Sequence, residues 1–227
     1  MNKKFVISLI GAPASGKGYI ASCLTGELEK KYGICPEDIA DISMGELIRR
    51  EKKANTSLGQ LLAANMKEGG LAPDSIINQM LIDELHRVQA KVLILDGYPR
   101  TVGQVYTFDK MMKWFDCAVI FRDTPTELIM DRVKNRRICA DCGKAQDASN
   151  GVCEFCGGEL IKRKDDSVLP ERLAEYEKVT KPAVEELKKL DNNFFEYEGC
   201  AEGEDIARQF CAANKNLFQP LARCHTA

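Results

Sequence analysis

A glycine-rich stretch near the N-terminus has the residue types of a phosphate-binding loop. Its members are Gly11, Ala12, Pro13, Ala14, Ser15, Gly16, Lys17, Gly18 and Tyr19. In such a loop the backbone N–H groups and the positive end of the following helix bind an anion, and Lys17 can reach the outer phosphates of a nucleotide. The spacing matches G-x-x-x-x-G-K, although Gly18 replaces the serine or threonine whose hydroxyl usually binds Mg²⁺. An ordinary glycine-rich turn before a helix is the alternative for this motif taken alone.

A carboxylate follows a second apolar segment. Asp96 comes directly after residues 92–95, which read VLIL, and Arg100 lies shortly beyond it. In a nucleotide-binding enzyme, an acid at the carboxyl end of a buried strand is placed to meet Mg²⁺, directly or through water. The sequence therefore predicts that Asp96 lies near the bound phosphates.

Four of the ten cysteines form two closely spaced pairs, Cys139, Cys142, Cys153 and Cys156. Two C-x2-C turns place four thiolates tetrahedrally, which suits a structural Zn²⁺; an iron site of similar spacing and a redox dithiol pair are the alternatives. Residues 137–164 around them lack periodic apolar positions, so a bound metal is the expected source of their order. The other six cysteines are scattered, unlike the disulfide framework of a secreted protein.

Alternating strands and helices are expected to position these groups. Apolar runs predict strands at 5–10, 92–95, 117–121 and 193–197, and residues 36–42 are expected to be extended. Periodicity and helix-start signals, including a capping box of Ser43 and Glu46, predict helices at 19–32, 44–50, 57–67, 74–85, 103–113, 125–136, 170–190 and 203–214. This order predicts an α/β fold with a parallel sheet, helices on both faces and a ligand crevice at the carboxyl ends of the strands. We expect the tail from Asn214 onward to be frayed.

The overall composition is that of a soluble globular protein. The chain has 227 residues, of which 44% are hydrophobic and 29% charged, and its net charge is −2. This charge gives no broad attraction to nucleic acid or to membranes. No apolar run is long enough to cross a bilayer and no signal peptide is recognisable, so a reducing cytoplasm is the expected compartment.

Six segments, in order, give nearly the whole chain a resemblance to a known family. They are the glycine-rich loop, residues 42–49 (ISMGELIR), 70–74 (GLAPD), 95–101 (LDGYPRT) with Gln104, 131–137 (DRVKNRR) and 163–166 (RKDD). The chain resembles the long-form adenylate kinases, which are nucleoside-monophosphate kinases with a zinc-binding lid. The resemblance implies an α/β P-loop core, with a parallel sheet flanked by helices, at residues 1–42, 73–134 and 165–227. It also implies a helical monophosphate-binding insertion at 43–72 and a small zinc-binding lid at 135–164.

The resemblance further implies an activity and its residues. The activity is reversible transfer of the γ-phosphoryl group of Mg-ATP to AMP, giving two ADP, by a monomer that binds neither nucleic acid nor membranes. The implied catalytic side chains are Lys17, Arg100, Arg136, Arg163 and Arg172. ATP would bind the loop from Gly11 to Tyr19, Arg136, and Arg132, which would stack on the base. The implied AMP-binding residues are Ser43, Met44, Arg49, Leu71, Ala72, Gly97, Arg100, Gln104, Arg163 and Arg172. Gln104 would read the AMP base, Asp96 would hold Mg²⁺ through water, the four paired cysteines would hold Zn²⁺, and Asp165 would tether lid arginines.

Several positions depart from the family pattern. Ala14 stands where glycine is usual, and Tyr19 and Met44 stand where threonine is usual. The segment from Asp166 to Arg172 is shorter than expected, which affects the register of Arg172. Two alternatives to an active adenylate kinase follow: a kinase for another nucleoside monophosphate, and an attenuated paralogue that binds nucleotides without turnover.

Overall fold

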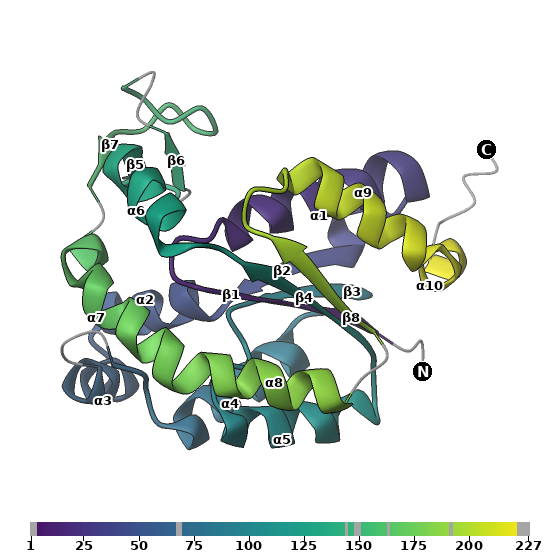
Figure 1. Ribbon diagram of the computed structural model, residues 1–227, viewed down its shortest axis with the longest axis horizontal. Helices are drawn as coiled ribbons and strands as arrows, with labels where there is room; N and C mark the ends of the chain where they lie inside the picture. The colour runs from purple at the N-terminus through teal and green to yellow at the C-terminus, as the bar shows by residue number, and fades with distance from the viewer. Residues whose placement is uncertain are drawn as a thin grey trace.

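A five-stranded parallel sheet forms the centre of the molecule (Figure 1). The structure is a computed structural model that describes residues 4–66, 70–143, 145–147, 151–162, 164–190 and 193–221. The strands are β1 (Phe5–Gly11), β2 (Ile39–Ser43), β3 (Val92–Asp96), β4 (Asp116–Asp123) and β8 (Phe194–Glu198), in the order β2-β3-β1-β4-β8. Every neighbouring pair is parallel, which confirms the predicted α/β class. The carboxyl ends of the strands therefore lie along one edge.

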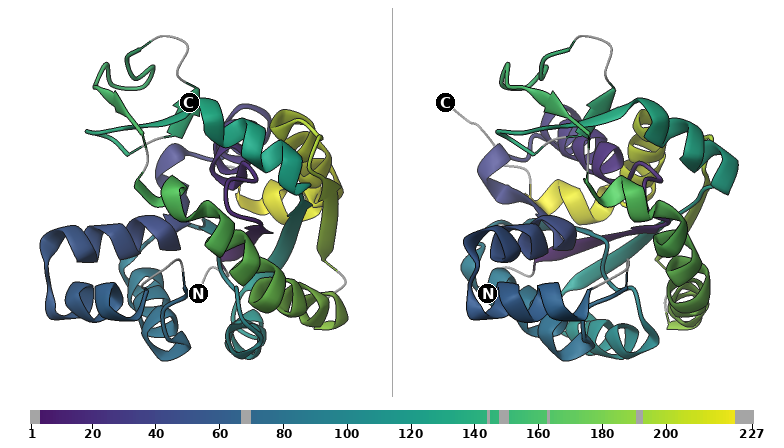
Figure 2. Two further views of the ribbon diagram at one scale, coloured as in Figure 1. Left: turned by 60° about the vertical axis from the view of Figure 1, so that its left-hand side comes forward. Right: turned by 90° about the vertical axis from the view of Figure 1, so that its left-hand side faces the viewer.

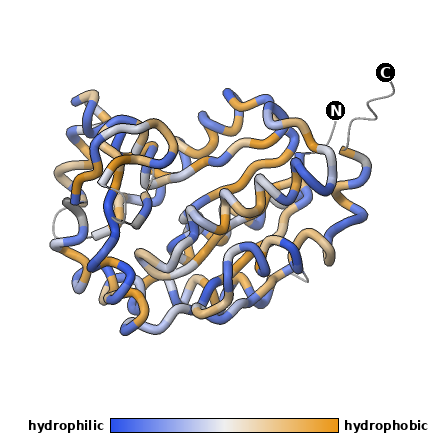
Figure 3. Tube along the Cα trace, turned by 90° about the horizontal axis from the view of Figure 1, so that it is seen from above, coloured by the Kyte–Doolittle hydropathy of each residue, from blue (hydrophilic) through white to orange (hydrophobic). Residues whose placement is uncertain are grey.

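Helices cover both faces of this sheet, because successive strand residues point to opposite sides. Phe5, Ile7 and Leu9 of β1 pack against one helical layer, whereas Val6 and Ile10 pack against the other. The first layer consists of α1 (Lys17–Tyr32), α9 (Gly203–Ala213) and α10 (Lys215–Phe218). The second contains α4 (Asp74–Arg87), α5 (Val102–Met112), α7 (Leu169–Glu175) and α8 (Lys181–Leu190). Figure 1 shows the layers above and below the sheet. Figure 3, which views the molecule from above, shows hydrophobic (orange) and hydrophilic (blue) residues alternating along the chain.

A smaller sheet stands apart from the central one (Figure 2). It follows α6 (Thr126–Asn135) and consists of β5 (Arg136–Cys139), β6 (Ala145–Asp147) and β7 (Leu160–Ile161), which are antiparallel in the order β6-β5-β7. These strands are absent from the sequence-based expectation, because they are too short to produce an apolar run.

Two short helices lie between β2 and α4, as predicted: α2 (Met44–Ala54) and α3 (Ser57–Asn65). Ser43 occupies the N-cap position of α2, but its side chain makes no capping hydrogen bond, so the predicted capping box is wrong. Thr56 does cap α3, since its hydroxyl accepts the N–H of Gly59 at 2.9 Å.

Two further expectations need correction. The predicted helix at 170–190 is divided into α7 and α8 by a π-helical turn at Tyr176–Thr180. Of the tail expected to be frayed, Lys215–Phe218 forms α10, and residues 222–227 lie outside the described residues. Phe218 is fully buried because its ring meets that of Phe5 edge-on, with the centroids 5.1 Å apart. Within the described ranges, no helix combines the length and apolar character needed to cross a bilayer.

Candidate functional site

The glycine-rich loop joins β1 to α1 at the carboxyl edge of the sheet. Gly16 is the N-cap residue of α1 with a φ of 92°, and Ala14 also has a positive φ, of 60°. The left-handed region suits glycine and strains alanine, so Ala14 holds its conformation at an energetic cost. The Lys17 ammonium donates to the carbonyl oxygens of Gly11 and Ala12 at 3.0 and 2.9 Å, which keeps its charge beside the loop.

A cleft of about 960 Å³ opens beside the loop. The predicted residues that line it are Gly11, Pro13, Ala14, Gly16, Lys17, Gly18, Tyr19, Ser43, Arg49, Leu71, Asp96, Gly97, Arg100, Arg132, Arg136 and Arg172. They come from the loop, β2, α2, β3, α6, β5, α7 and the connections between them. One lysine and five arginines of the predicted set therefore meet in a single cleft. Guanidinium groups bind phosphates in bidentate fashion and stay charged, so this wall suits a ligand with several phosphates.

Two arginines donate hydrogen bonds to the segment after β8, and one of them, Arg132, also donates to the loop. Arg132 of α6 donates to the carbonyl oxygens of Ser15 at 3.1 Å and Gly199 at 2.9 Å. Arg122, near the end of β4, donates to the same Gly199 oxygen at 2.9 Å and also to the carbonyl oxygen of Ala201. Arg122 is 4% exposed, and burial together with the charge of Arg132 lowers its pKa. Sequence reasoning missed Arg122, although a charged residue directly after the apolar segment 117–121 was an available signal.

The segment after β3 brings Arg100 to the cleft. Its Nε donates to the carbonyl oxygen of Gly97 at 2.8 Å. Gly97 has a φ of 81°, and an added Cβ there would collide with the Arg100 guanidinium. Glycine is therefore needed at this position for two reasons. Arg49 reaches the same cleft from α2, where the carboxylate of Glu46 lies 4.0 Å from its guanidinium.

Gln104 lies behind this segment rather than on the cleft wall. Its side chain is 2% exposed; Oε1 accepts the backbone N–H of Arg100 and Nε2 donates to Asp74, both at 2.8 Å. Gln104 would have to exchange these partners to contact a base. The other predicted residues that are buried away from the lining are Ala12, Ser15, Met44 and Ala72.

The remaining predicted arginines lie toward the small sheet. Arg136, at the start of β5, forms an ion pair with Asp166, and both side chains are mostly buried. Arg172 lines the cleft from α7. The predicted Arg163 lies outside the described residues, as does the side chain of Asp165. The acidic partner of Arg136 is therefore Asp166, which is next to the predicted Asp165.

Asp96 has the features of a cation-binding carboxylate. It ends β3 and lines the cleft. Its Oδ1 is buried and has no hydrogen-bond partner in the described part of the chain. An unpaired buried carboxylate oxygen is costly, and Mg²⁺ prefers carboxylate oxygens and water as ligands. The residue therefore fits a magnesium ion that accompanies a nucleotide.

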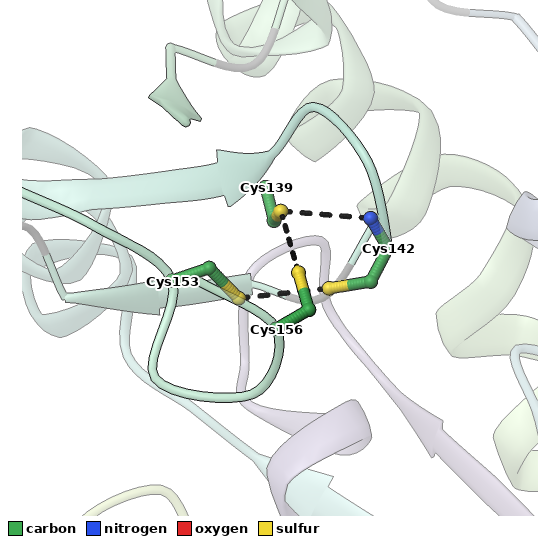
Figure 4. Close-up of side chains that lie close together, drawn as sticks. All are labelled: Cys139, Cys142, Cys153 and Cys156. Carbon is green, nitrogen blue, oxygen red and sulfur yellow. Dashed lines mark hydrogen bonds between the residues drawn. The ribbon is translucent and has the colours of Figure 1, made fainter. Parts of the chain in front are cut away.

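Four thiols gather beside the small sheet (Figure 4). The Sγ atoms of Cys139, Cys142, Cys153 and Cys156 all lie within 4.8 Å of one another, with 3.5 Å between Cys139 and Cys156 and 3.6 Å between Cys142 and Cys153. A tetrahedral Zn²⁺ with bonds of about 2.3 Å separates its sulfur ligands by about 3.8 Å. The backbone N–H of Cys142 points to Cys139 Sγ at 3.5 Å and lowers the pKa of that thiol to about 7. The cluster can therefore hold a metal ion.

Comparison with known proteins agrees with this geometry. The sequence model of the adenylate kinase family matches residues 9–192. An adenylate kinase of Thermosipho melanesiensis is 33% identical over 215 residues, which cover 89% of this chain and 96% of that protein. An adenylate kinase of Thermococcus kodakarensis is 38% identical over 191 residues, which cover 78% of this chain and 80% of that protein. One of Clostridium tetani is 35% identical over 195 residues, covering 80% and 86%. The chain therefore belongs to the adenylate kinase family of nucleoside-monophosphate kinases, which are phosphotransferases.

Proposed function

We propose that this chain catalyses the reversible transfer of the γ-phosphoryl group of Mg-ATP to AMP, which yields two ADP. The observation that carries the proposal is the convergence of Lys17, Arg49 and Arg100 with further arginines on one cleft beside a phosphate-binding loop. Membership of the adenylate kinase family supports the same reaction. Phosphoryl transfer needs little covalent help from a protein; it needs two phosphate chains held in line with their charge neutralised.

The ATP side of the cleft is the glycine-rich loop. Its backbone N–H groups and Lys17 would hold the β- and γ-phosphates, and Arg132 and Arg136 would approach from α6 and β5. Lys17 would exchange the neutral carbonyl oxygens of Gly11 and Ala12 for phosphate oxygens. A hydrogen bond to a charged acceptor is about twice as strong as one to a neutral acceptor, so Lys17 would bind the phosphates in preference to the carbonyl oxygens.

The AMP side is formed by α2 and the segment after β3. Arg49 and Arg100 would clamp the AMP phosphate, and Ser43, Leu71 and Gly97 line the same cleft. We assign the buried Met44, Ala72 and Gln104 to the layer behind this wall, where Gln104 fixes the backbone of Arg100.

Transfer would occur in a closed form of a three-part molecule. The proposed parts are a core (residues 1–42, 73–134 and 165–227), a monophosphate-binding insertion (43–72) and a lid (135–164) built around the small sheet. Closure would bring Arg136, Arg163 and Arg172 onto the transferring group and exclude water, so that AMP rather than water receives the phosphate. We propose that the enzyme acts as a monomer.

Two metal ions complete the proposal. Zn²⁺ on Cys139, Cys142, Cys153 and Cys156 would be structural, because four thiolates leave no open coordination position. Mg²⁺ arriving with ATP neutralises phosphate charge, and Asp96 would hold it through water.

Substitution of Arg100 tests the proposal. Because the Arg100 charge would be needed in the transition state, Arg100→Ala should lower the turnover of Mg-ATP and AMP by about 10²-fold or more. Arg87→Ala is the matched control, since Arg87 is exposed, pairs with Glu84 on α4 and does not line the cleft. It should retain turnover close to that of the unmodified protein. Near-normal turnover of the Arg100 variant, in a steady-state assay of ADP formation, would contradict the assignment.

A further inference from the structure

Tyr19, in the first turn of α1, is an aromatic side chain on a wall that is otherwise rich in cations. It is 51% exposed and lines the cleft beside Gly18 and Ser22. Among the exposed large hydrophobic side chains of the described residues, Tyr19 and Phe155 are the two that line the cleft. An aromatic ring does not bind phosphate, but the planar base of a nucleotide can stack on it.

The ring of Tyr19 is held from two sides. Its hydroxyl donates to the Glu204 carboxylate in the first turn of α9, and this hydrogen bond raises the pKa of the phenol. A Cβ added at Gly203 would lie 2.8 Å from both Tyr19 Cδ1 and Cε1, closer than real Cβ atoms approach. Gly203 therefore leaves the space that the ring occupies. An aromatic face that is fixed in advance costs little entropy when a ligand stacks on it.

Tyr19 borders the same segment as Arg132. The segment after β8 accepts a hydrogen bond from Arg132 at Gly199, and α9, which follows this segment directly, begins at Gly203 beside the Tyr19 ring. Both side chains also line the cleft. Lys17 lies in the same helical turn as Tyr19, so a nucleotide whose phosphates occupy the loop can direct its base toward this segment. Phe155 is similarly exposed, but it lies in a turn between β6 and β7 rather than beside this segment.

We propose that the phenol ring of Tyr19, positioned by Glu204, is a contact surface for the base of ATP, with Arg132 on the other side of that base. Tyr19 thus contributes to the affinity for ATP through its side chain, in addition to any backbone contact with phosphate. This inference rests on the ATP site of the proposed function.

The test compares two probes that share phosphates and differ in the base. Binding of ATP and of inorganic tripolyphosphate is measured for the unmodified protein, Tyr19→Ala and Tyr19→Phe. Stacking of a base on an aromatic side chain is worth about 1–3 kcal/mol, which corresponds to about 5- to 150-fold in affinity. Tyr19→Ala should therefore weaken ATP binding by about tenfold and leave tripolyphosphate binding within about twofold. Tyr19→Phe retains the ring and should bind ATP within about threefold of the unmodified protein.

Tyr106→Ala is the matched control, because Tyr106 is 58% exposed on α5 and does not line the cleft. It should leave both affinities unchanged. Equal weakening of both probes by Tyr19→Ala would assign the side chain to the shape of the phosphate loop and overturn the inference, as would unchanged ATP binding. An unmodified protein that binds tripolyphosphate but gains no affinity from the base of ATP would also overturn it. Failure of the unmodified protein to bind either probe would instead overturn the proposed ATP site itself.

Discussion

Ala14 occupies a position of the phosphate loop whose backbone favours glycine. Its φ of 60° lies in the left-handed region, where a residue with a Cβ loses about 1–2 kcal/mol. The family pattern usually has glycine at this position, and the backbone angle gives the physical reason. The loop nevertheless keeps its connection from β1 to α1, because Gly16 supplies the second left-handed residue and Lys17 ties the turn to the carbonyl oxygens of Gly11 and Ala12.

Replacement of Ala14 should therefore stabilise the protein. Ala14→Gly relieves the strain but adds freedom to the unfolded chain, so we expect a net gain of about 0.5–1 kcal/mol in the free energy of unfolding. Ala174→Gly is a control with the opposite expected sign, because Ala174 is exposed within α7. This substitution should lower the free energy of unfolding by about 1 kcal/mol. Urea unfolding measures both. A loss of stability in the Ala14 variant as large as that in the control would contradict the strain argument.

Motif spacing predicts charged residues of the site better than it predicts buried ones. Lys17, Arg49 and Arg100 line the cleft as expected, because each stands in a segment whose local turn or helix directs it there. Gln104 stands in an equally recognisable segment, yet its amide is engaged by Asp74 and the backbone of Arg100. No single segment reveals that choice of partner, since Asp74 comes from a different helix.

The apolar strands of the central sheet can be predicted from the sequence, whereas the short strands near the cysteine cluster cannot. Strands β1 and β3 are buried apolar runs of the parallel sheet, so their composition alone indicates them. The strands β5, β6 and β7 span two to four residues each and contain few apolar side chains. They are held by hydrogen bonds between strands and by the geometry of the thiol cluster, neither of which leaves a periodic signal.

The small sheet should therefore depend on the Zn²⁺ proposed for the four cysteines. Cys153→Ser removes a buried thiol of the cluster, so we expect loss of most bound Zn²⁺ and rapid proteolytic cleavage within residues 136–162, with the helical signal of the core preserved. Metal analysis and limited proteolysis measure these effects. Cys200→Ser is the matched control, because Cys200 is exposed and lies outside the cluster, and it should keep both the metal and the protection. Full zinc content in the Cys153 variant would contradict the four-thiolate site.

At the scale of the whole molecule, the topology explains why distant segments share one site. The order β2-β3-β1-β4-β8 places the carboxyl ends of β1 and β3 side by side, so the loop after β1 faces Asp96 and Arg100 after β3. Helix α2 after β2, the small sheet after α6 and helix α7 supply further lining residues. The alternation of strands and helices along the sequence predicts that the ligand binds at this edge of the sheet. It does not predict Arg122, which acts inside the fold, where it joins β4 to the segment after β8.

The most direct test of the central claim is an assay of ADP formation. It uses zinc-loaded protein, Mg-ATP and, in turn, AMP, CMP, UMP and GMP as phosphate acceptors. We predict rapid turnover with AMP and much slower turnover with the other three. Faster turnover with another monophosphate would contradict the assignment of AMP as the substrate. Absence of ADP with all four acceptors, in a protein that still binds ATP, would contradict the proposed phosphoryl transfer and would indicate a nucleotide-binding relative without catalytic activity.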